Sequence, residues 1–512
     1  MTVKKARRFL FLFLTGAVWI TALSCGSSTV VPSKKPNIVI IYVDDLGYGD
    51  VGCYGATAVQ TPNVDALAKG GLKFTDAHCS ASTCTPSRYA ILTGRYAFRN
   101  HAAILPGDAP LIIPPGSGTL PSLLKKAGYA TGVIGKWHLG LGDGQTDWNT
   151  NIKPGPLEIG FDYSFLIPAT PDRVPTVYVE GHQVVNLDRK DPIVISYSHR
   201  VGNDPVGLDH PEMLKMAADS QHSGTIVNDI SRIGFMKGGH QAYWKDEDFA
   251  TVLNDKVTAF MTQYKNQPFF LYYSLPSIHV PRAPNAKFIG VTKMGPRGDD
   301  IVQMDWMTGE VMKTLKQLGL EKNTLVIFTS DNGPVLDDGY ADQAVQLLGD
   351  HHPAGIYKGG KYSAYEGGTR VPTIVYWPGQ IQAGESSALV SQVDLYASLA
   401  ALTGQKIDTA QEAPDSKNML AAFLGTAKDG RTELVEESYA LSLRSGNWKY
   451  IAPFSGTTPD WLKNKEVPTG LLPAPQLYNL EEDPRENHNL ADQYPDMVKQ
   501  MAAELNRIID HS

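Results

Sequence analysis

The chain has 512 residues, of which 42% are hydrophobic and 19% are charged, which is enough for a large core and for a main domain with a smaller one. Its 46 basic and 53 acidic residues give a formal net charge of −7. Nucleic-acid-binding proteins are usually basic, so this balance argues against that class. An anionic substrate would have to be held by a local cluster of cations.

The N-terminus has the pattern of an export signal. Basic residues within positions 4–8 precede the apolar stretch 9–23, which is shorter than the about 20 residues of a membrane span. Residues 22–25, Ala-Leu-Ser-Cys, resemble a relaxed bacterial lipoprotein box. We therefore expect residues 1–25 to be a signal peptide and Cys25 to be lipidated, giving an exported, membrane-anchored protein of the periplasm or cell surface. Simple cleavage and a stable transmembrane anchor remain the alternatives.

Residues 37–43 form the first apolar run of the exported part. An uninterrupted run of this length is typical of a strand buried on both faces. Asp44 and Asp45 follow it directly, and a helical pattern covers 63–70.

Residues 79–95 predict a short helix that begins beside a cysteine. Thr85 is a good N-cap, Pro86 suits the first helical position, and Gly94 is a suitable C-terminal stop. Cys84 would then lie at the positive end of the helix, where an anion is favoured. The alternative interpretation is a capped helix with an incidental buried cysteine.

Four more apolar runs predict strands, and each has polar side chains beside it. They are 130–134, followed by Lys136 and His138; 268–273, followed by His279; 324–328, followed by Asp331 and Asn332; and 371–376, preceded by Lys361 and by residues 366–370.

Helical patterns alternate with these strands at 119–128, 248–265 and 303–318. The alternation implies an α/β fold with a large, mostly parallel sheet sandwiched by helices. In such sheets, ligands bind beyond the carboxyl ends of the strands. The polar residues that follow the strands would therefore gather around Cys84 at one edge of the sheet.

The pattern changes after about residue 405. Residues 437–451 predict a hairpin with its turn at 445–447, and 495–509 predict an amphipathic helix. We expect a main domain over 33–405 and a smaller C-terminal α+β subdomain with an antiparallel sheet over 406–512.

The Cys-Thr-Pro-Ser-Arg motif at 84–88, continued by Leu-Thr-Gly-Arg at 92–95, resembles the signature of the formylglycine-dependent type I sulfatases. These are arylsulfatase-like enzymes of the alkaline phosphatase superfamily. The resemblance extends from residue 37 to the final helix, including the small C-terminal subdomain. It implies that a maturation enzyme converts Cys84 to formylglycine, which acts as the nucleophile in the form of a hydrated aldehyde.

The resemblance also implies a metal site. Its ligands would be Asp44, Asp45, Asp331 and Asn332, with the converted residue 84 completing the shell. Hard oxygen donors of this kind suit Ca²⁺, suit Mg²⁺ less well, and argue against zinc. The alternative is that Asp44-Asp45 and Asp331-Asn332-Gly333 are only turns.

Two histidines and three cations complete the catalytic group implied by the resemblance. His279 would protonate the leaving alcohol, and His138 would deprotonate residue 84 in the step that expels sulfate. Lys136 and Lys361 would hold sulfate oxygens, and Arg88 would orient residue 84 and support the metal shell. Lys358 is a competitor for the role of Lys361.

The substrate is expected by resemblance alone to be a sulfated glycan, as for bacterial glycan sulfatases of the gut or the sea, with sulfated galactose or N-acetylgalactosamine first. Asp172 and Arg173 could bind sugar hydroxyls, or they could form a surface ion pair. His101 and His351 are weaker candidates. A phosphate or phosphonate ester hydrolase of the same superfamily and a non-catalytic glycan-binding protein remain alternatives.

The chain has only four cysteines, so it has no disulfide framework. Cys25 and Cys84 already have expected roles. Cys53 and Cys79 could pair in an oxidising compartment, or they could remain buried thiols.

Overall fold

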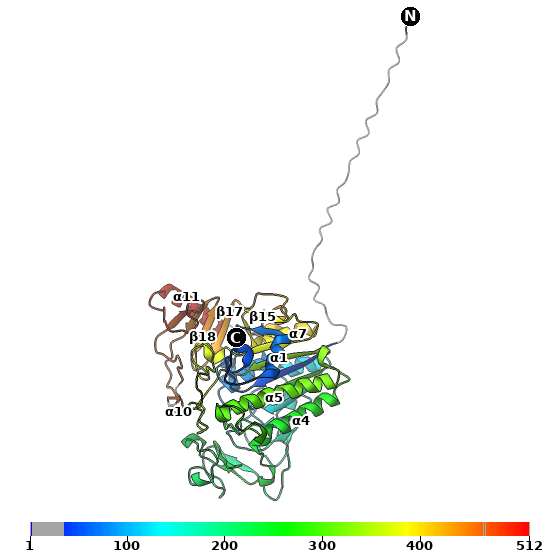
Figure 1. Ribbon diagram of the computed structural model, residues 1–512, viewed down its shortest axis with the longest axis vertical. Coiled ribbons are helices and arrows are strands. Elements are labelled where there is room, and N and C mark those ends of the chain that lie inside the picture. Colours follow the sequence, from blue (N-terminus) through cyan, green and yellow to red (C-terminus); the bar gives the residue numbers. More distant parts are fainter. Residues whose placement is uncertain (1, 3–34, 464, 466, 511–512) are drawn as a thin grey trace. The chain divides into compact units, whose positions relative to one another are not determined.

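A ten-stranded sheet forms the centre of the molecule (Figure 1). The computed structural model describes residue 2 and residues 35–510, except 464 and 466. Cys25 and residues 3–25 of the expected signal peptide therefore lie outside the described residues. Within residues 35–510, none of the described helices combines the length and the apolarity needed to cross a bilayer.

The five central strands of this sheet are parallel. In order across the sheet they are β13 (Thr324–Ser330), β1 (Asn37–Val43), β12 (Phe269–Ser274), β4 (Ala130–Lys136) and β5 (Tyr163–Ile167). Four of these strands match the apolar runs of the sequence, so the prediction of a mostly parallel sheet is confirmed.

Both edges of the sheet are mixed. Beyond β13 lie β14 (Thr373–Tyr376), β2 (Leu72–Phe74) and β15 (Gly384–Ser386), and beyond β5 lie β6 (Val179–Glu180) and β7 (Gln183–Val184). The run at 371–376 does form a strand, β14, but it is antiparallel to β13.

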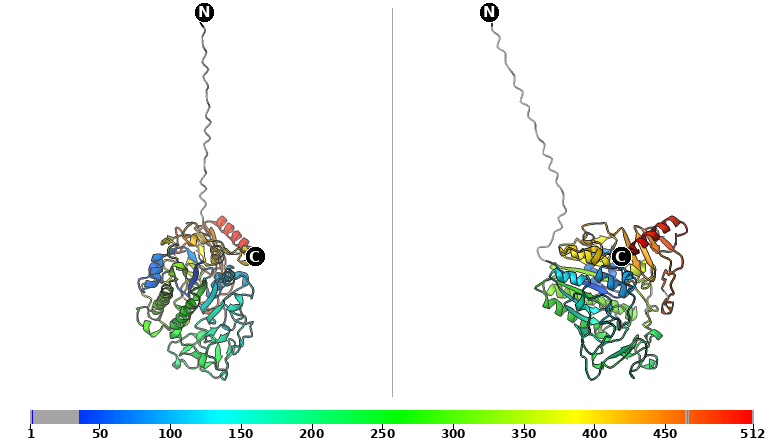
Figure 2. Two further views of the ribbon diagram at one scale, coloured as in Figure 1. Left: turned by 90° about the vertical axis from the view of Figure 1, so that its right-hand side faces the viewer. Right: turned by 180° about the vertical axis from the view of Figure 1, so that it is seen from behind.

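Helices cover both faces of the sheet (Figures 1 and 2). Alternate residues of β1 divide between two hydrophobic clusters, Ile38 and Ile40 in one and Val39 and Ile41 in the other. The first cluster includes α2 (Cys84–Thr93), α3 (Leu120–Lys126) and α7 (Leu395–Leu402). The second includes α1 (Pro62–Gly70), α4 (Phe249–Gln263) and α5 (Gly295–Gln317).

Helix α2 begins two residues earlier than its sequence predicts. Its N-cap is Thr83, and Cys84 is its first residue. The prediction that Thr85 is the N-cap is wrong, because the Thr85 hydroxyl instead donates a hydrogen bond to the carbonyl of His138 at 3.0 Å. Gly94 does end the helix, with the left-handed φ of 65° that favours glycine.

The C-terminal region forms a second sheet. Its four antiparallel strands are β17 (Glu433–Glu437), β18 (Leu441–Ser445), β19 (Trp448–Ile451) and β20 (Gln476–Asn479), and helix α11 (Pro495–Asp510) packs against it. The expected hairpin and final helix are therefore confirmed. The described residues from 35 onward cluster into one compact unit, and the boundary expected near residue 405 stays a prediction.

The remaining elements are short. The helices are α6 (Glu366–Thr369), α8 (Thr409–Glu412), α9 (Leu420–Phe423) and α10 (Asp460–Lys463). The strand pairs are β3 (Ala77–His78) with β16 (Val390–Ser391), β8 (Val194–Ser196) with β11 (Phe235–Lys237), and β9 (Ile226–Val227) with β10 (Ile230–Ser231).

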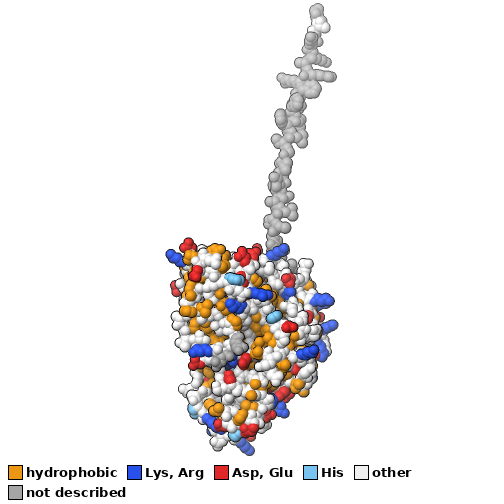
Figure 3. All heavy atoms as spheres, turned by 60° about the vertical axis from the view of Figure 1, so that its left-hand side comes forward, with side chains coloured by type: hydrophobic (Ala, Val, Ile, Leu, Met, Phe, Trp, Pro, Cys, Tyr) orange, Lys and Arg blue, Asp and Glu red, His pale blue; other side chains and the backbone are white. Residues whose placement is uncertain are grey.

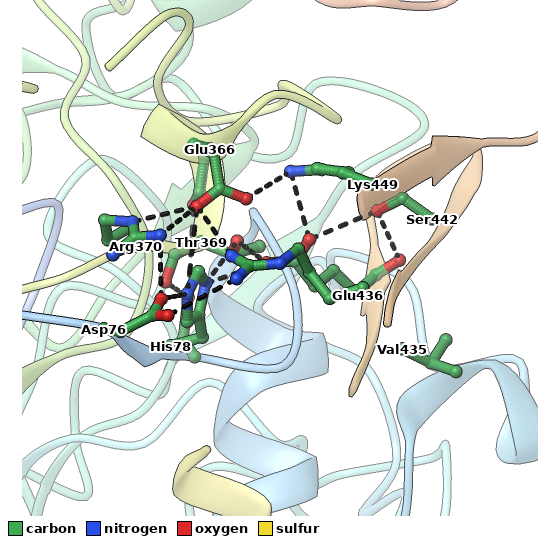
Figure 4. Close-up of polar contacts among 12 residues, drawn as sticks. Asp76, His78, Glu366, Thr369, Arg370, Val435, Glu436, Ser442 and Lys449 are labelled. Carbon is green, nitrogen blue, oxygen red and sulfur yellow. Dashed lines mark hydrogen bonds and ion pairs between the residues drawn. The ribbon is translucent and has the colours of Figure 1, made fainter. Parts of the chain in front are cut away.

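A buried histidine joins the C-terminal sheet to the segment that precedes α2 (Figure 4). The His78 ring lies 2.9 Å from Asp76 through Nε2 and 2.8 Å from Glu436 of β17 through Nδ1. Burial acts to lower the pKa of His78, but Glu436 and Glu366 outweigh it, so the pKa is raised. A ring with a carboxylate at each nitrogen is held as a cation.

Glu366 of α6 is the centre of the same network. It lies 2.6 Å from Arg370, 2.9 Å from Lys449 of β19 and 3.3 Å from Arg444 of β18. Because three cations already neutralise this carboxylate, the cluster is an ion-pair network and not a metal site. It fixes the segments before Cys84 and after Lys361 against the C-terminal sheet (Figure 4).

We expect His78→Ala to lower the free energy of unfolding by about 3 kcal/mol, because it removes a cation from the buried Glu436 and the partly buried Asp76. A raised histidine pKa contributes stability that is complete below the unfolded value of about 6.5 and is lost as the pH rises through the folded value. The loss should therefore be larger at pH 6 than at pH 9 in denaturant titrations. His101→Ala, at an exposed histidine outside the network, is the control. Equal losses at both pH values would contradict the assignment of a charged His78.

Candidate active site

Acidic side chains come together at the carboxyl ends of neighbouring parallel strands. Asp44 and Asp45 follow β1, and Asp331 and Asn332 follow β13. Lys136 is the last residue of β4. Since β13, β1, β12 and β4 are consecutive in the sheet, their ends form one edge, as the sequence predicts.

Each aspartate of this group has a buried cation beside it. The pairs are Lys136 with Asp44 at 2.6 Å, Arg88 with Asp331 at 2.6 Å, and Lys361 with Asp45 at 2.9 Å. All six side chains are almost completely inaccessible to solvent. On the molecular face shown in Figure 3, by contrast, charges of both signs are interspersed. The cations that could bind an anionic substrate in this site are therefore the three buried ones.

The oxygen atoms of this group fit a divalent cation. Asp44 Oδ1 and Asn332 Oδ1 are buried without a hydrogen-bond partner. Burial raises the pKa of Asp44 and of Asp45 even though lysines lie beside them, whereas the Arg88 guanidinium outweighs burial at Asp331 and lowers its pKa. Asp44, Asp45 and His279 each place a ligand atom within 4.8 Å of the others. Carboxylate and amide oxygens of this kind are hard-cation ligands.

Cys84 lies at the start of α2 and lines a cavity of about 570 Å³. Burial raises the pKa of its thiol, although Lys136 and Lys361 act in the opposite direction. An unmodified thiol with a raised pKa is protonated and is a poor nucleophile at neutral pH.

The two candidate histidines have fixed orientations. His279 Nδ1 lies 2.6 Å from the Val280 carbonyl, and His138 Nε2 lies 2.9 Å from the Leu105 carbonyl. A carbonyl only accepts, so each of these nitrogens carries the proton of the neutral ring. Burial, together with nearby lysines, lowers both pKa values well below the usual range. Each ring therefore presents a second nitrogen with a free lone pair.

The cavity brings together most of the expected substrate-binding residues. Asp172 and Arg173 lie in its wall, with 3.0 Å between their charged groups, and His101 lines it as well. The Asp172–Arg173 pair is therefore not an ion pair of the open surface. His351 lies elsewhere, since its buried Nε2 is 2.8 Å from Asp50.

The position of Lys361 also distinguishes it from its competitor. Lys361 lines the cavity, whereas Lys358 donates to the backbone carbonyl of Glu486 at 3.0 Å. Cys53, Cys79 and Cys84 are unpaired among the described residues, so the disulfide considered for the first two does not form.

Several residues of the cavity were not singled out from the sequence. His222 lies 2.7 Å from Asp219 and 3.4 Å from Asp172, so it stands between two carboxylates. Asp338 accepts a hydrogen bond from Lys361 at 3.1 Å. Neither residue follows a strand or belongs to a motif. His222 ends a one-turn 3-10 helix and Asp338 lies in a loop, and only the fold brings both to Cys84.

The fold and the site together define a hydrolase of sulfuric esters. The chain belongs to the Sulfatase family, whose model matches residues 36–405. Membership favours sulfate ester hydrolysis over the phosphate ester and non-catalytic alternatives. Sulfatases generally use a formylglycine and a divalent metal, and the oxygen cluster described above is a candidate for the metal site.

Two curated relatives and one solved structure are similar over most of the chain. An N-acetylgalactosamine-6-O-sulfatase of Bacteroides thetaiotaomicron is 48% identical over 93% of each chain. Human arylsulfatase A is 32% identical over 92% of this chain and 86% of its own. A solved structure from a study of glycosaminoglycan metabolism in B. thetaiotaomicron has a TM-score of 0.91 and 48% identity, covering 93% of this chain and 99% of its own.

The metal assignment predicts a change in stability that does not depend on activity. Ca²⁺ at about 100 times its dissociation constant should add about 2.7 kcal/mol to the free energy of unfolding, because it binds only the folded site. Asp45→Asn should remove most of this gain, whereas Asp337→Asn, at an exposed carboxylate outside the cluster, should keep it. Thermal unfolding with chelator and with added Ca²⁺ or Mg²⁺ measures the effect. An equal gain in the wild type and in Asp45→Asn would refute the site.

Proposed function

We propose that this protein hydrolyses sulfate esters of galactose or N-acetylgalactosamine residues in glycans. The observation that carries the proposal is the 48% identity, over 93% of both chains, with a relative named for N-acetylgalactosamine 6-O-sulfate. The cavity supports the proposal, because the Asp172–Arg173 pair and Cys84 line the same cavity. Charged side chains that hydrogen-bond sugar hydroxyls discriminate strongly against an analogue that lacks one.

We assign the nucleophile to formylglycine formed from Cys84 by a maturation enzyme. When present, its hydrated aldehyde supplies an attacking hydroxyl and a second hydroxyl from which sulfate can be expelled. Ca²⁺, with Mg²⁺ second, is the cation that Asp44, Asp45, Asp331 and Asn332 would hold, and it would add positive charge beside residue 84.

Two of the buried cations, Lys136 and Lys361, bind the sulfuryl group. Lys361 lines the cavity, Lys136 is the last residue of β4, and Arg88 lies in α2 beside Asp331. Each is already held by an aspartate, so none needs to reorganise when charge develops on the sulfuryl oxygens. Arg88 orients the carboxylates of the proposed metal site through its 2.6 Å contact with Asp331, and we assign it no direct contact with the substrate.

The two histidines move protons. Each uses one nitrogen to donate to a backbone carbonyl, which leaves the other free. His279 lines the cavity, and the negative charge of a bound sulfate ester favours protonation of its free nitrogen, from which the leaving sugar oxygen takes the proton. His138, whose free Nδ1 is buried without a partner, accepts a proton from the second hydroxyl of residue 84.

We further propose that the protein is exported and acts in the periplasm or at the cell surface, attached through a lipidated Cys25. The support is the basic and apolar pattern of residues 1–25. Labelling of cells with a lipid precursor, for the wild type and for Cys25→Ala, tests the attachment.

The proposed function predicts a defined substrate range. Matured protein, in which peptide mass spectrometry finds oxygen in place of the Cys84 sulfur, should desulfate 6-sulfated N-acetylgalactosamine or galactose and should leave 6-sulfated glucosamine nearly untouched. Protein that contains only unmodified Cys84 should be inactive, because its thiol is protonated. Asp172→Asn should weaken the preference for the galactose configuration by about 10-fold or more. Full activity of the unmodified protein, or no activity on either galactose-type sugar, would refute the proposal.

The proton-transfer role of His279 predicts a difference between leaving groups. A sugar alkoxide needs a proton to leave, whereas an activated phenolate hardly does. His279→Ala should therefore lower kcat/KM on a sugar sulfate by about 10²–10⁴-fold and on an aryl sulfate far less. Lys361→Ala should lower both by a similar factor of about 10²–10³, since both substrates share the sulfuryl group. Equal losses for His279→Ala on the two substrates would instead make His279 a sulfate ligand.

A further inference from the structure

A second large cavity adjoins the one that contains Cys84. Both have a volume of about 570 Å³, within the range of about 300–1,000 Å³ typical of ligand sites. Gln221 and Trp461 line both cavities. The two spaces are therefore neighbours that share a wall, and a ligand that fills the first and continues past this wall enters the second.

Trp461 is the main feature of the shared wall. Its ring is partly exposed and packs edge-to-face on Tyr362, with 5.0 Å between the ring centres and an angle of 70°. The Tyr362 hydroxyl donates to Asp338, which also accepts from Lys361. The indole is thus held against the same group that positions a sulfate-binding lysine. A partly exposed indole offers an apolar face on which the C–H side of a sugar ring can pack.

The polar lining of the second cavity is acidic. Its charged side chains are Asp219, Asp337, Asp342, Asp460 and Lys465. Lys465 is already paired with Asp338 at 3.2 Å, Asp342 with Arg282 at 2.5 Å and Asp460 with Lys463 at 2.6 Å. Asp219 and Asp337 are the lining carboxylates without a lysine or arginine partner among these pairs. Carboxylates accept hydrogen bonds from hydroxyl groups, but they repel a carboxylate or a sulfate. The first cavity also has carboxylates in its lining, Asp172, Asp338 and Glu437, but it adds the two cations Lys361 and Arg173.

We propose that the second cavity is a subsite for an uncharged sugar residue joined to the sulfated one, with Trp461 as its stacking platform. The enzyme then acts on sulfated residues within neutral glycan chains in preference to chains that alternate with uronic acids. This inference rests on the proposed function, since the first cavity must hold the sulfated sugar. The addition to that function is the type of sugar residue, an uncharged one, that the protein prefers next to the sulfated sugar.

Three matched substrates test the subsite. They are one 6-sulfated galactose-type sugar alone, the same sugar joined to galactose, and the same sugar joined to glucuronic acid. We expect wild-type kcat/KM to be about 10-fold higher for the galactose-linked substrate than for the glucuronate-linked one, and the gap to narrow as salt screens the repulsion. The galactose-linked substrate should also exceed the monosaccharide.

Two variants assign the effect to residues. Trp461→Ala should lower the ratio of galactose-linked to monosaccharide activity by about 3- to 10-fold, and Trp461→Phe should restore much of it. Asp337→Asn combined with Asp460→Asn should reduce the ratio of kcat/KM for the galactose-linked substrate to kcat/KM for the glucuronate-linked substrate. Tyr494→Ala, at an exposed aromatic ring in the C-terminal region, is the control and should change neither ratio.

The outcomes separate the inference from the proposed function. Turnover of all three substrates at one rate, or a preference for glucuronate, would overturn the subsite and leave the sulfatase assignment intact. A wild-type preference that survives Trp461→Ala unchanged would overturn the role of the indole. Absence of turnover on every sulfated sugar would refute the proposed function, and the subsite with it.

Discussion

The site depends on the burial of three aspartates at the ends of parallel strands. Water cannot neutralise Asp44, Asp45 and Asp331 there, so each needs a partner from the protein. Lys136, Lys361 and Arg88 supply that charge from three different parts of the chain. Because each cation is fixed by its carboxylate, it is already in place when an anionic substrate arrives. The ion pairs that make burial of the aspartates possible therefore also hold the cations in position to stabilise an anion.

The C-terminal sheet supports this arrangement from outside the cavity. Glu366 and Arg370 follow Lys361 in the chain, and His78 precedes Cys84. Their contacts with Glu436 and Lys449 tie both segments to β17 and β19 (Figure 4). Loss of one partner from such a buried network costs more than loss of a surface ion pair, because the remaining charge has no access to water. Local stability and the position of the catalytic groups are thus coupled.

The sequence allowed the parts of the molecule with local signals to be predicted. The uninterrupted apolar run at 37–43 is enough to predict a buried strand, and the motif at 84–88 is recognisable from its residues alone. The ends of parallel strands meet at one edge of the sheet, so the residues after them could be predicted to lie together. Thr85 shows the limit of local reasoning, because a carbonyl from another loop takes its hydroxyl. His222 and Trp461 lie in single-turn helices, too short to carry a periodic pattern, so only the tertiary fold brings them to the cavity.

Chemistry and selectivity have different structural sources in this enzyme. The metal-binding group and Lys136 lie on or directly after strands of the central sheet, and Cys84 begins a helix packed on that sheet, so the packed core resists small displacements. The residues that could recognise the rest of the glycan come from loops and very short helices: Asp172 and Gln221 from the region between β5 and α4, and Trp461 from α10. Loops tolerate substitution and insertion that a buried sheet does not. Sulfatases of one fold can therefore change their sugar by changing these loops, while the strand ends keep the sulfate chemistry constant.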